Sequence, residues 1–144
     1  MVAYADTSFL VSLYSQDANS TAAQELAGAL KAPLAFTPLH RLEARNAIRL
    51  AVFRHEITPA ECREVLAIID ANIKAGALLE FPVAWAEACA EAEALSAAHT
   101  DKLGTRALDL LHVAAAAVLG VKDFFTFDIR QKALAVKAGM KVRP

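Results

Sequence analysis

Several features that define other protein classes are scarce or absent in this 144-residue sequence. The apolar residues are dispersed and rich in alanine, and no run approaches the ~20 residues that a membrane-spanning helix requires. The N-terminus lacks a basic segment followed by an apolar signal region, so we expect a cytoplasmic protein. Basic residues are not in excess, because 15 Lys and Arg stand against 16 Asp and Glu. Any contact with nucleic acid must therefore depend on local basic patches.

Cysteine is also scarce. The two cysteines, Cys62 and Cys89, form no Cys-x-x-Cys pair, and no histidine stands near either at zinc-ligand spacing. Both lie in helical-looking segments, where we expect small buried thiols. Hydrophobic residues make up 56% of the chain, which is ample for one core, so we predict a single domain over residues 1–144.

Short apolar runs of β type alternate with longer segments of helical character. The predicted strands are 2–5, 34–37, 78–81, 124–127 and 141–143, and the predicted helices are 39–55, 59–75, 83–98, 106–119 and 129–138, with a shorter helical pair within 8–31. We expect residues 99–104 to form an exposed loop. Strands that alternate with helices predict an α/β fold in which a parallel sheet is covered by helices on both faces.

Four acidic residues follow or interrupt apolar runs, where an unpaired charge is costly: Asp6, Glu43, Asp109 and Asp128. Asp6 and Asp128 follow the first and fourth predicted strands, and Glu43 begins the helix after the second strand. The carboxyl ends of parallel strands form the edge at which ligands bind in open α/β sheets. Asp109 lies in the first turns of the helix that leads to the fourth strand. The pattern therefore predicts that the acids gather at one edge.

Carboxylates that converge in this way repel one another, and two unit charges ~4 Å apart interact by ~4 kcal/mol at an effective dielectric of ~20. A divalent cation removes this penalty. Oxygen ligands without nearby cysteine or histidine suit Mg²⁺ or Mn²⁺ better than Zn²⁺. Because these ions polarise phosphoryl oxygens and lower the pKa of a bound water, the pattern indicates phosphodiester hydrolysis.

Three of the acids also have explanations that need no metal. Asp128 and Gln131 have the spacing of a capping box, so Asp128 could cap the last helix. Asp6 could cap the short helix after the first strand. Glu43 could be an exposed first-turn acid that the helix dipole favours.

Asp109 is the hardest of the four to explain without a metal. Aspartate is a poor helix former, and this one stands among leucines. Its alternative role is a bond to Thr105 or Arg106. None of these alternatives explains why all four acids should fall on one predicted edge, and this joint placement favours a cation site.

Three segments of the chain resemble one known family when they are taken together. They are Asp-Thr-Ser-Phe-Leu at 6–10, Leu-Asp-Leu-Leu-His-Val-Ala-Ala at 108–115, and Phe-Thr-Phe-Asp-Ile-Arg-Gln at 125–131, the last followed by Leu-Ala at 134–135 and Gly-Met-Lys-Val at 139–142. Their order and spacing resemble PIN-domain ribonucleases, and closely the small VapC-type toxins of type II toxin-antitoxin systems. The resemblance spans the whole chain. It implies a PIN-like three-layer α/β/α fold with a central, mainly parallel sheet of about five strands.

The resemblance also implies a function and a site. Asp6, Glu43, Asp109 and Asp128 would be the family's acidic quartet, holding one or two Mg²⁺ or Mn²⁺ ions, with Asp6 and Asp109 as the principal ligands. Metal-activated water would hydrolyse RNA phosphodiester bonds. The implied partners are a second copy of the chain and a cognate antitoxin that covers the acidic cleft. The alternatives are an RNA-processing PIN nuclease outside toxin-antitoxin systems and a non-catalytic RNA-binding or protein-interaction module.

Other polar residues near the acids could support such a site. Ser8 or the adjacent Thr7 could orient a ligand or a water. Asn46 lies one turn from Glu43 and could bond that carboxylate. We interpret His112 as a helix-packing imidazole bonded to a backbone group, because metal-activated water needs no histidine.

Basic residues could contact RNA or an antitoxin. The candidates are Arg106, Arg130, Lys102, Arg41, Arg45 and Arg49. The last three recur at four-residue steps and so form one stripe on their helix. At ~100° per residue, Glu43 points well away from this stripe. The stripe could be an RNA backbone track, an antitoxin contact or a plain solvated face.

Overall fold

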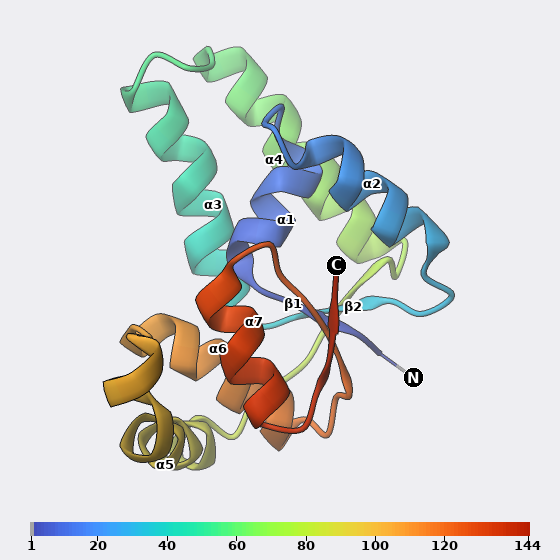
Figure 1. Cartoon of the computed structure of the whole chain (residues 1–144). Helices are drawn as coiled ribbons and strands as arrows, with labels where there is room; N and C mark the ends of the chain where they lie inside the picture. The colour runs from blue at the N-terminus through green and yellow to red at the C-terminus, as the bar shows by residue number, and fades with distance from the viewer. Residues whose placement is uncertain (1) are drawn as a thin grey trace. The chain divides into compact units, whose positions relative to one another are not determined.

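Figure 1 shows the computed structural model, which describes residues 2–144. Over this range the chain forms seven helices and five short strands, and none of these helices is long and apolar enough to cross a membrane. The contacts divide the chain into two compact units: unit 1 contains Thr7–Phe81, and unit 2 contains Val2–Asp6 with Pro82–Pro144. The single domain over residues 1–144 stays a prediction.

Unit 1 is a helical unit with a small sheet. Its elements are α1 (Thr7–Tyr14), α2 (Ser20–Ala29), β2 (Leu34–Phe36), α3 (Pro38–Phe53), α4 (Pro59–Lys74) and β3 (Leu78–Glu80). Strands β2 and β3 pair in parallel, with Leu34 opposite Leu78. Helices α3 and α4 pack together as a hairpin (Figure 1). Each begins with a threonine cap followed by proline, at Thr37 and Thr58, as the sequence predicts.

Unit 2 is made of two separate segments of the chain, Val2–Asp6 and Pro82–Pro144. Its elements are β1 (Tyr4–Ala5), α5 (Trp85–Leu103), α6 (Ala107–Val118), β4 (Asp123–Phe125), α7 (Ile129–Lys137) and β5 (Lys141–Arg143). The strand order is β1-β4-β5 and both pairings are parallel, so β4 is central. Phe124 and Phe125 of β4 are buried, as expected for a strand covered on both faces. The pairing of β1 with β4 places Asp6 beside the end of β4.

The α/β class and the parallel strand pairing are confirmed. All five strands occur at the predicted positions, although each is only two or three residues long. In the described part of the chain they form a three-stranded and a two-stranded sheet, not one sheet of five. Apolar runs identify strands from the sequence, but they do not specify which strands pair.

Two sequence predictions are wrong in α5. The expected loop at 99–104 is the end of this helix, which continues to Leu103 and stops at Gly104 in the left-handed conformation with φ 64°. The stop signal is thus the glycine and not the polar residues before it. Cys89 is exposed, whereas Cys62 is buried as predicted. The neighbouring Ala88 faces the core, and the ~100° step of the helix turns Cys89 away from it.

Candidate metal centre

Asp6 lies directly after β1 and is only 2% exposed. Its backbone N–H donates to the Phe125 carbonyl at 3.0 Å, which extends the parallel pairing by one residue. The Thr126 hydroxyl donates to Asp6 Oδ2 at 2.5 Å. A buried carboxylate needs such a donor to offset its lost hydration. The pairing of β1 with β4 therefore positions Asp6 and also supplies one of its partners.

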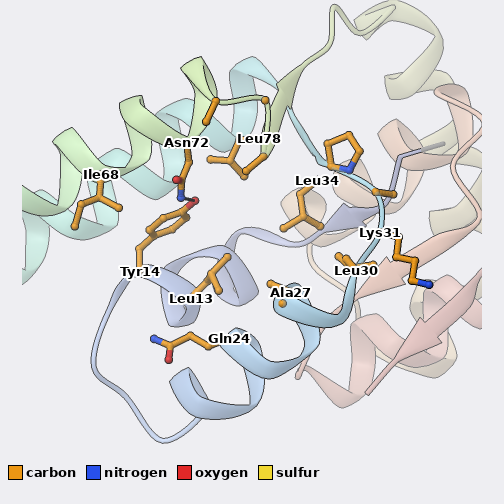
Figure 2. Close-up of a pocket in the computed structure, with 16 residues that line it drawn as sticks. Leu13, Tyr14, Gln24, Ala27, Leu30, Lys31, Leu34, Ile68, Asn72 and Leu78 are labelled. Atoms are coloured by element: carbon orange, nitrogen blue, oxygen red, sulfur yellow. Dashed lines mark hydrogen bonds between the residues drawn. The ribbon is translucent and has the colours of Figure 1, made fainter.

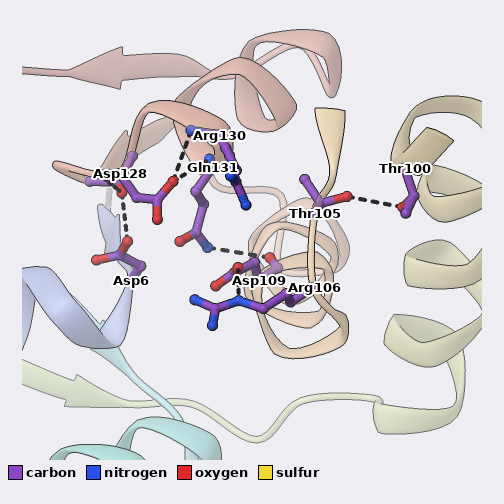
Figure 3. Close-up of polar contacts among 9 residues, drawn as sticks. Asp6, Thr100, Thr105, Arg106, Asp109, Asp128, Arg130 and Gln131 are labelled. Carbon is purple, nitrogen blue, oxygen red and sulfur yellow. Dashed lines mark hydrogen bonds and ion pairs between the residues drawn. The ribbon is translucent and has the colours of Figure 1, made fainter. Parts of the chain in front are cut away.

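Thr126 joins Asp6 to the start of α7. Besides donating to Asp6, its hydroxyl accepts a hydrogen bond from the Asp128 backbone N–H at 3.0 Å. Thr126 is buried and stands between two phenylalanines. One side chain therefore fixes the Asp6 carboxylate and the turn that carries Asp128. Figure 3 shows Asp6 and Asp128 on neighbouring segments of this network.

Asp128 caps α7, so the metal-free role considered for it is present. Its Oδ1 accepts hydrogen bonds from the N–H groups of Arg130 and Gln131, at 2.8 and 3.0 Å. The Gln131 amide does not complete the box, because it donates to the Asp109 carbonyl at 3.3 Å. Both cap bonds fall on Oδ1. Capping therefore leaves Oδ2 of Asp128 available to a ligand.

Asp109 lies in the first turn of α6 and its side chain is 27% exposed. The predicted contact with Arg106 is found, with Arg106 Nε 3.6 Å from Asp109 Oδ2. This distance is too long for a hydrogen bond. The other predicted partner, Thr105, forms a hydrogen bond with Thr100 at 2.9 Å. The backbone of Asp109 is linked to α7 by Gln131, which brings the two helix starts together.

Asp109 and Asp128 line the same cavity in unit 2, with a volume of about 330 Å³. The lining residues are Gly104, Arg106, Asp109, Phe127, Asp128, Ile129 and Arg130. They come from the starts of α6 and α7, as Figure 3 shows for the labelled side chains. The N-terminus of a helix carries a partial positive charge, so both helix starts contribute to the electrostatics of this cavity.

Glu43 belongs to unit 1, in the second turn of α3. The Thr7 hydroxyl donates to Glu43 Oε1 at 2.8 Å, which gives Thr7 a role in holding this carboxylate. Asn46, the partner considered from the sequence, is exposed, and so is Ser8. The structure thus places three of the four acids in unit 2 and the fourth in unit 1.

The cavity residues fit a hydrated Mg²⁺ or Mn²⁺. Among residues 2–144, no three acidic, histidine or cysteine side chains are grouped closely enough to enclose a metal ion. Mg²⁺ does not require such a cage, because it keeps several waters and is usually bound by one or two carboxylates. Two carboxylates line the cavity, and no thiol or imidazole lines it to favour Zn²⁺.

The arginine stripe of α3 takes part in ion pairs within unit 1. Arg41 contacts Glu80 at 2.7 Å and Arg45 contacts Asp70 at 2.7 Å. The Arg45 guanidinium holds the pKa of Asp70 below its usual value. Arg49 is exposed. Two of the three arginines therefore have structural partners, which favours the solvated-face interpretation for them.

A second cavity, of about 710 Å³, lies in unit 1 (Figure 2). It is bounded by α1, α2, α4 and the starts of β2 and β3, and no acidic residue lines it. Asn72 donates to the Tyr14 hydroxyl there at 2.6 Å, and burial raises the pKa of Tyr14. Without a carboxylate, this cavity has no ligand of the kind that Mg²⁺ prefers.

Tyr4 and Thr126 are buried near the site and had no predicted role, and Gln131 was considered only as a capping partner of Asp128. Tyr4 forms a hydrogen bond with His112 Nδ1 at 2.8 Å, so a side chain is one partner of this imidazole where a backbone group was expected. The available signal was a polar side chain inside an apolar run. Such a residue needs a partner when it is buried.

Comparisons with known proteins now identify the family. The PIN domain family model matches residues 3–137. The chain therefore belongs to the PIN domain family, and its fold is the PIN fold. No curated protein sequence matches it significantly.

Solved structures with the same fold are distant in sequence. The toxin VapC20 (Rv2549c) of Mycobacterium tuberculosis, described as a Sarcin-Ricin loop cleaving toxin, is 20% identical, with a TM-score of 0.71 and 100% of both chains covered. VapBC2 from Rickettsia felis, bound to a DNA fragment from their promoter, is 13% identical, with a TM-score of 0.61 and coverage of 99% of this chain and 98% of that chain. FitAcB from Neisseria gonorrhoeae is 15% identical, with a TM-score of 0.63 and coverage of 99% and 96%. At these identities the likeness establishes the fold.

Proposed function

We propose that this protein is a divalent-metal-dependent endoribonuclease and the toxin of a toxin-antitoxin pair. The observation that carries the proposal is the cavity at the starts of α6 and α7, where Asp109 and Asp128 lie together. Asp6 is tied to the same turn through Thr126. The similarity to a Mycobacterium tuberculosis toxin described as cleaving the Sarcin-Ricin loop supports RNA as the substrate.

In this proposal Asp6 and Asp109 remain the principal ligands of the cation, and Asp128, which lines the cavity with Asp109, completes the site. Mg²⁺, or Mn²⁺ in its place, would lower the pKa of a water and offset the charge on the phosphate. Thr126 fixes the orientation of Asp6. Glu43, held by Thr7, is included as the fourth acid because of the family resemblance.

The proposed partners follow from the same resemblance. They are a cognate antitoxin and a second copy of the chain, in the cytoplasm. The structural neighbour from Rickettsia felis was solved as VapBC2 with a fragment of its promoter. A small upstream reading frame with a DNA-binding N-terminus beside this gene would favour the toxin over an RNA-processing PIN nuclease.

The direct test is to replace Asp6 or Asp109 with asparagine, which keeps the shape of the side chain and removes its charge. We expect D6N and D109N to lose cleavage of single-stranded RNA in Mg²⁺ while their melting temperatures stay close to that of the wild type. Asp101 is exposed on α5, and D101N is the matched control that should keep full activity. Full activity in D6N or D109N would contradict the proposed function.

Calorimetry with Mn²⁺ separates the nuclease from a non-catalytic RNA-binding module. A module of that kind has no reason to bind a divalent cation at Asp109 and Asp128. We expect the wild-type protein to bind Mn²⁺ and D109N to bind it much more weakly, because one of the two carboxylate ligands at the cavity is lost.

A further inference from the structure

Arg106 holds Asp109 only weakly. The distance from Arg106 Nε to Asp109 Oδ2 is 3.6 Å, and the Arg106 side chain is 82% exposed. Exposed ion pairs contribute about 0–1 kcal/mol, and a contact beyond hydrogen-bond distance belongs at the low end. Among the ion pairs of residues 2–144, this is the one that Asp109 makes. Arg106 can therefore leave Asp109 for a stronger partner at a small cost in free energy.

The positive and negative side chains that line the cavity are equal in number when no metal is bound. The charged lining residues are Arg106, Arg130, Asp109 and Asp128, two of each sign, so their formal charge is zero. A divalent cation adds two positive charges at the oxygen that Arg106 faces. The cation and the guanidinium then repel each other, because both are positively charged and both lie at Asp109 Oδ2.

We propose that Arg106 is an exchangeable counter-ion, which pairs with Asp109 in the metal-free protein and with an RNA phosphate when a divalent cation is bound. This inference rests on the proposed function. Arg106 occupies the N-cap position of α6 with extended backbone, φ −95° and ψ 161°, and its side chain makes no cap hydrogen bond. The guanidinium is thus free to leave Asp109 without disturbing the helix.

Phosphate is a suitable second partner for this arginine. A guanidinium can donate two parallel hydrogen bonds to a phosphate, which a lysine ammonium cannot. The N-termini of α6 and α7, which supply residues to the cavity, add a partial positive charge that also favours a phosphate. With a cation bound, the lining changes from neutral to a formal charge of two positive units, which attracts the RNA backbone.

Arg130 provides an internal comparison. It lines the same cavity, but its described contact with Asp128 is made by its backbone N–H and survives replacement of the side chain. Lys137 provides an external control, because it is exposed at the far end of the nine-residue α7, about 12 Å along the helix axis from Ile129. All three variants, R106Q, R130Q and K137Q, remove one positive charge from unit 2.

The first experiment titrates Mn²⁺ into the metal-free protein by calorimetry. We expect R106Q to bind Mn²⁺ about two- to five-fold more tightly than the wild type, because both the competing counter-ion and its repulsion of the cation are gone. R130Q should gain less, K137Q should be unchanged, and R106K should return close to wild type. An R106Q affinity that is unchanged or weaker would overturn the inference. An equal gain in R130Q would also overturn it, since the loss of any one positive charge at the cavity would then explain the tighter binding of Mn²⁺.

The second experiment measures RNA at saturating Mn²⁺. We expect R106Q to raise the KM for a single-stranded RNA more than it lowers kcat, and to reduce the salt dependence of RNA affinity by about one phosphate contact. Tighter metal binding with weaker RNA binding is the combination that a purely structural role would not produce. A wild-type protein that takes up no Mn²⁺ would contradict the proposed function itself. Mn²⁺ uptake with an unaltered KM in R106Q would contradict only the counter-ion role.

Discussion

Asp6 and Thr126 form a fully buried polar contact next to the proposed metal centre. The carboxylate accepts from a hydroxyl that is itself buried, and that hydroxyl also accepts from the Asp128 N–H. Hydrogen-bond partners of this kind fix the direction in which a ligand oxygen points. The position of Asp6 therefore depends on a side chain that is not acidic.

Replacing Thr126 with valine tests this dependence, because valine keeps the shape and removes the hydroxyl. We expect T126V to lose about 1–3 kcal/mol of unfolding free energy, since Asp6 loses a buried donor and the Asp128 N–H loses its acceptor. Mn²⁺ affinity should fall about 10- to 100-fold. Urea denaturation and calorimetry provide the two measurements.

Thr105 supplies the matched control for this variant. It is also buried, and its hydroxyl is bonded to Thr100 at 2.9 Å. T105V should lose stability without a comparable loss of Mn²⁺ affinity. Equal metal affinity in T126V and T105V would show that Thr126 does not orient Asp6.

The acids could be predicted from the sequence, but their partners could not. A charge next to an apolar run is visible in the sequence because its burial is costly. A threonine between two phenylalanines is an ordinary strand residue, and nothing local indicates that Thr126 bonds a residue 120 positions away. The sequence also does not rank the acids by burial. Asp109 stands among leucines, yet Asp6 is the more deeply buried.

Strand β1 and helix α6 are joined by the hydrogen bond between Tyr4 and His112. Both residues are buried, and the Tyr4 ring also stacks on Phe124 with centroids 5.6 Å apart. Because β1 contains only two residues, such side-chain contacts contribute much of its attachment. The bond links the strand before Asp6 to the helix that carries Asp109.

The variant Y4F removes this bond and keeps the stacked ring. We expect a loss of about 1–3 kcal/mol in unfolding free energy, because a buried hydrogen bond of His112 Nδ1 is removed. The control is Y14F, whose hydroxyl bonds the half-buried Asn72, so that water can replace it and the loss should be smaller. If Y4F and Y14F lose equal unfolding free energy in urea denaturation, the burial of the Tyr4 hydrogen bond does not contribute to stability.

Helix starts were easier to predict than helix ends and strand partners. A threonine followed by proline supplies a cap and a fixed φ, and both signals are local, as at Thr37 and Thr58. The end of α5 was misplaced because its polar last turn is compatible with a helix until Gly104 stops it. Strand pairing depends on contacts far apart in the chain, which a local pattern does not encode.

At the scale of the whole molecule, the ion pair between Arg45 and Asp70 makes stability depend on pH. The pKa of Asp70 is lowered in the folded state, so the unfolded chain takes up the proton more readily. The pair therefore stabilises the fold above the unfolded pKa of about 3.9, and its contribution is lost as the pH falls through the lower folded pKa.

The contribution of this ion pair to stability is small, because the side chains of Arg45 and Asp70 are 20% and 47% exposed. We expect D70N to reduce the unfolding free energy by about 0.2–1 kcal/mol at pH 7 and by progressively less below about pH 4. Urea denaturation at a series of pH values provides the measurement. A difference between D70N and wild type that does not shrink in acid would contradict this account.

Unit 2 also determines when the proposed metal centre can be assembled during synthesis. Strand β1 is made long before β4, with which it pairs, so Tyr4 must wait for Phe124. Asp6 likewise meets its hydroxyl partner only after 120 further positions have been translated. Domains generally fold as units while the chain emerges, and unit 2 cannot close before β4 and Thr126 have been made. A nascent chain that stops before them carries Asp6 without its hydroxyl donor. Translation itself therefore delays assembly of the proposed metal centre.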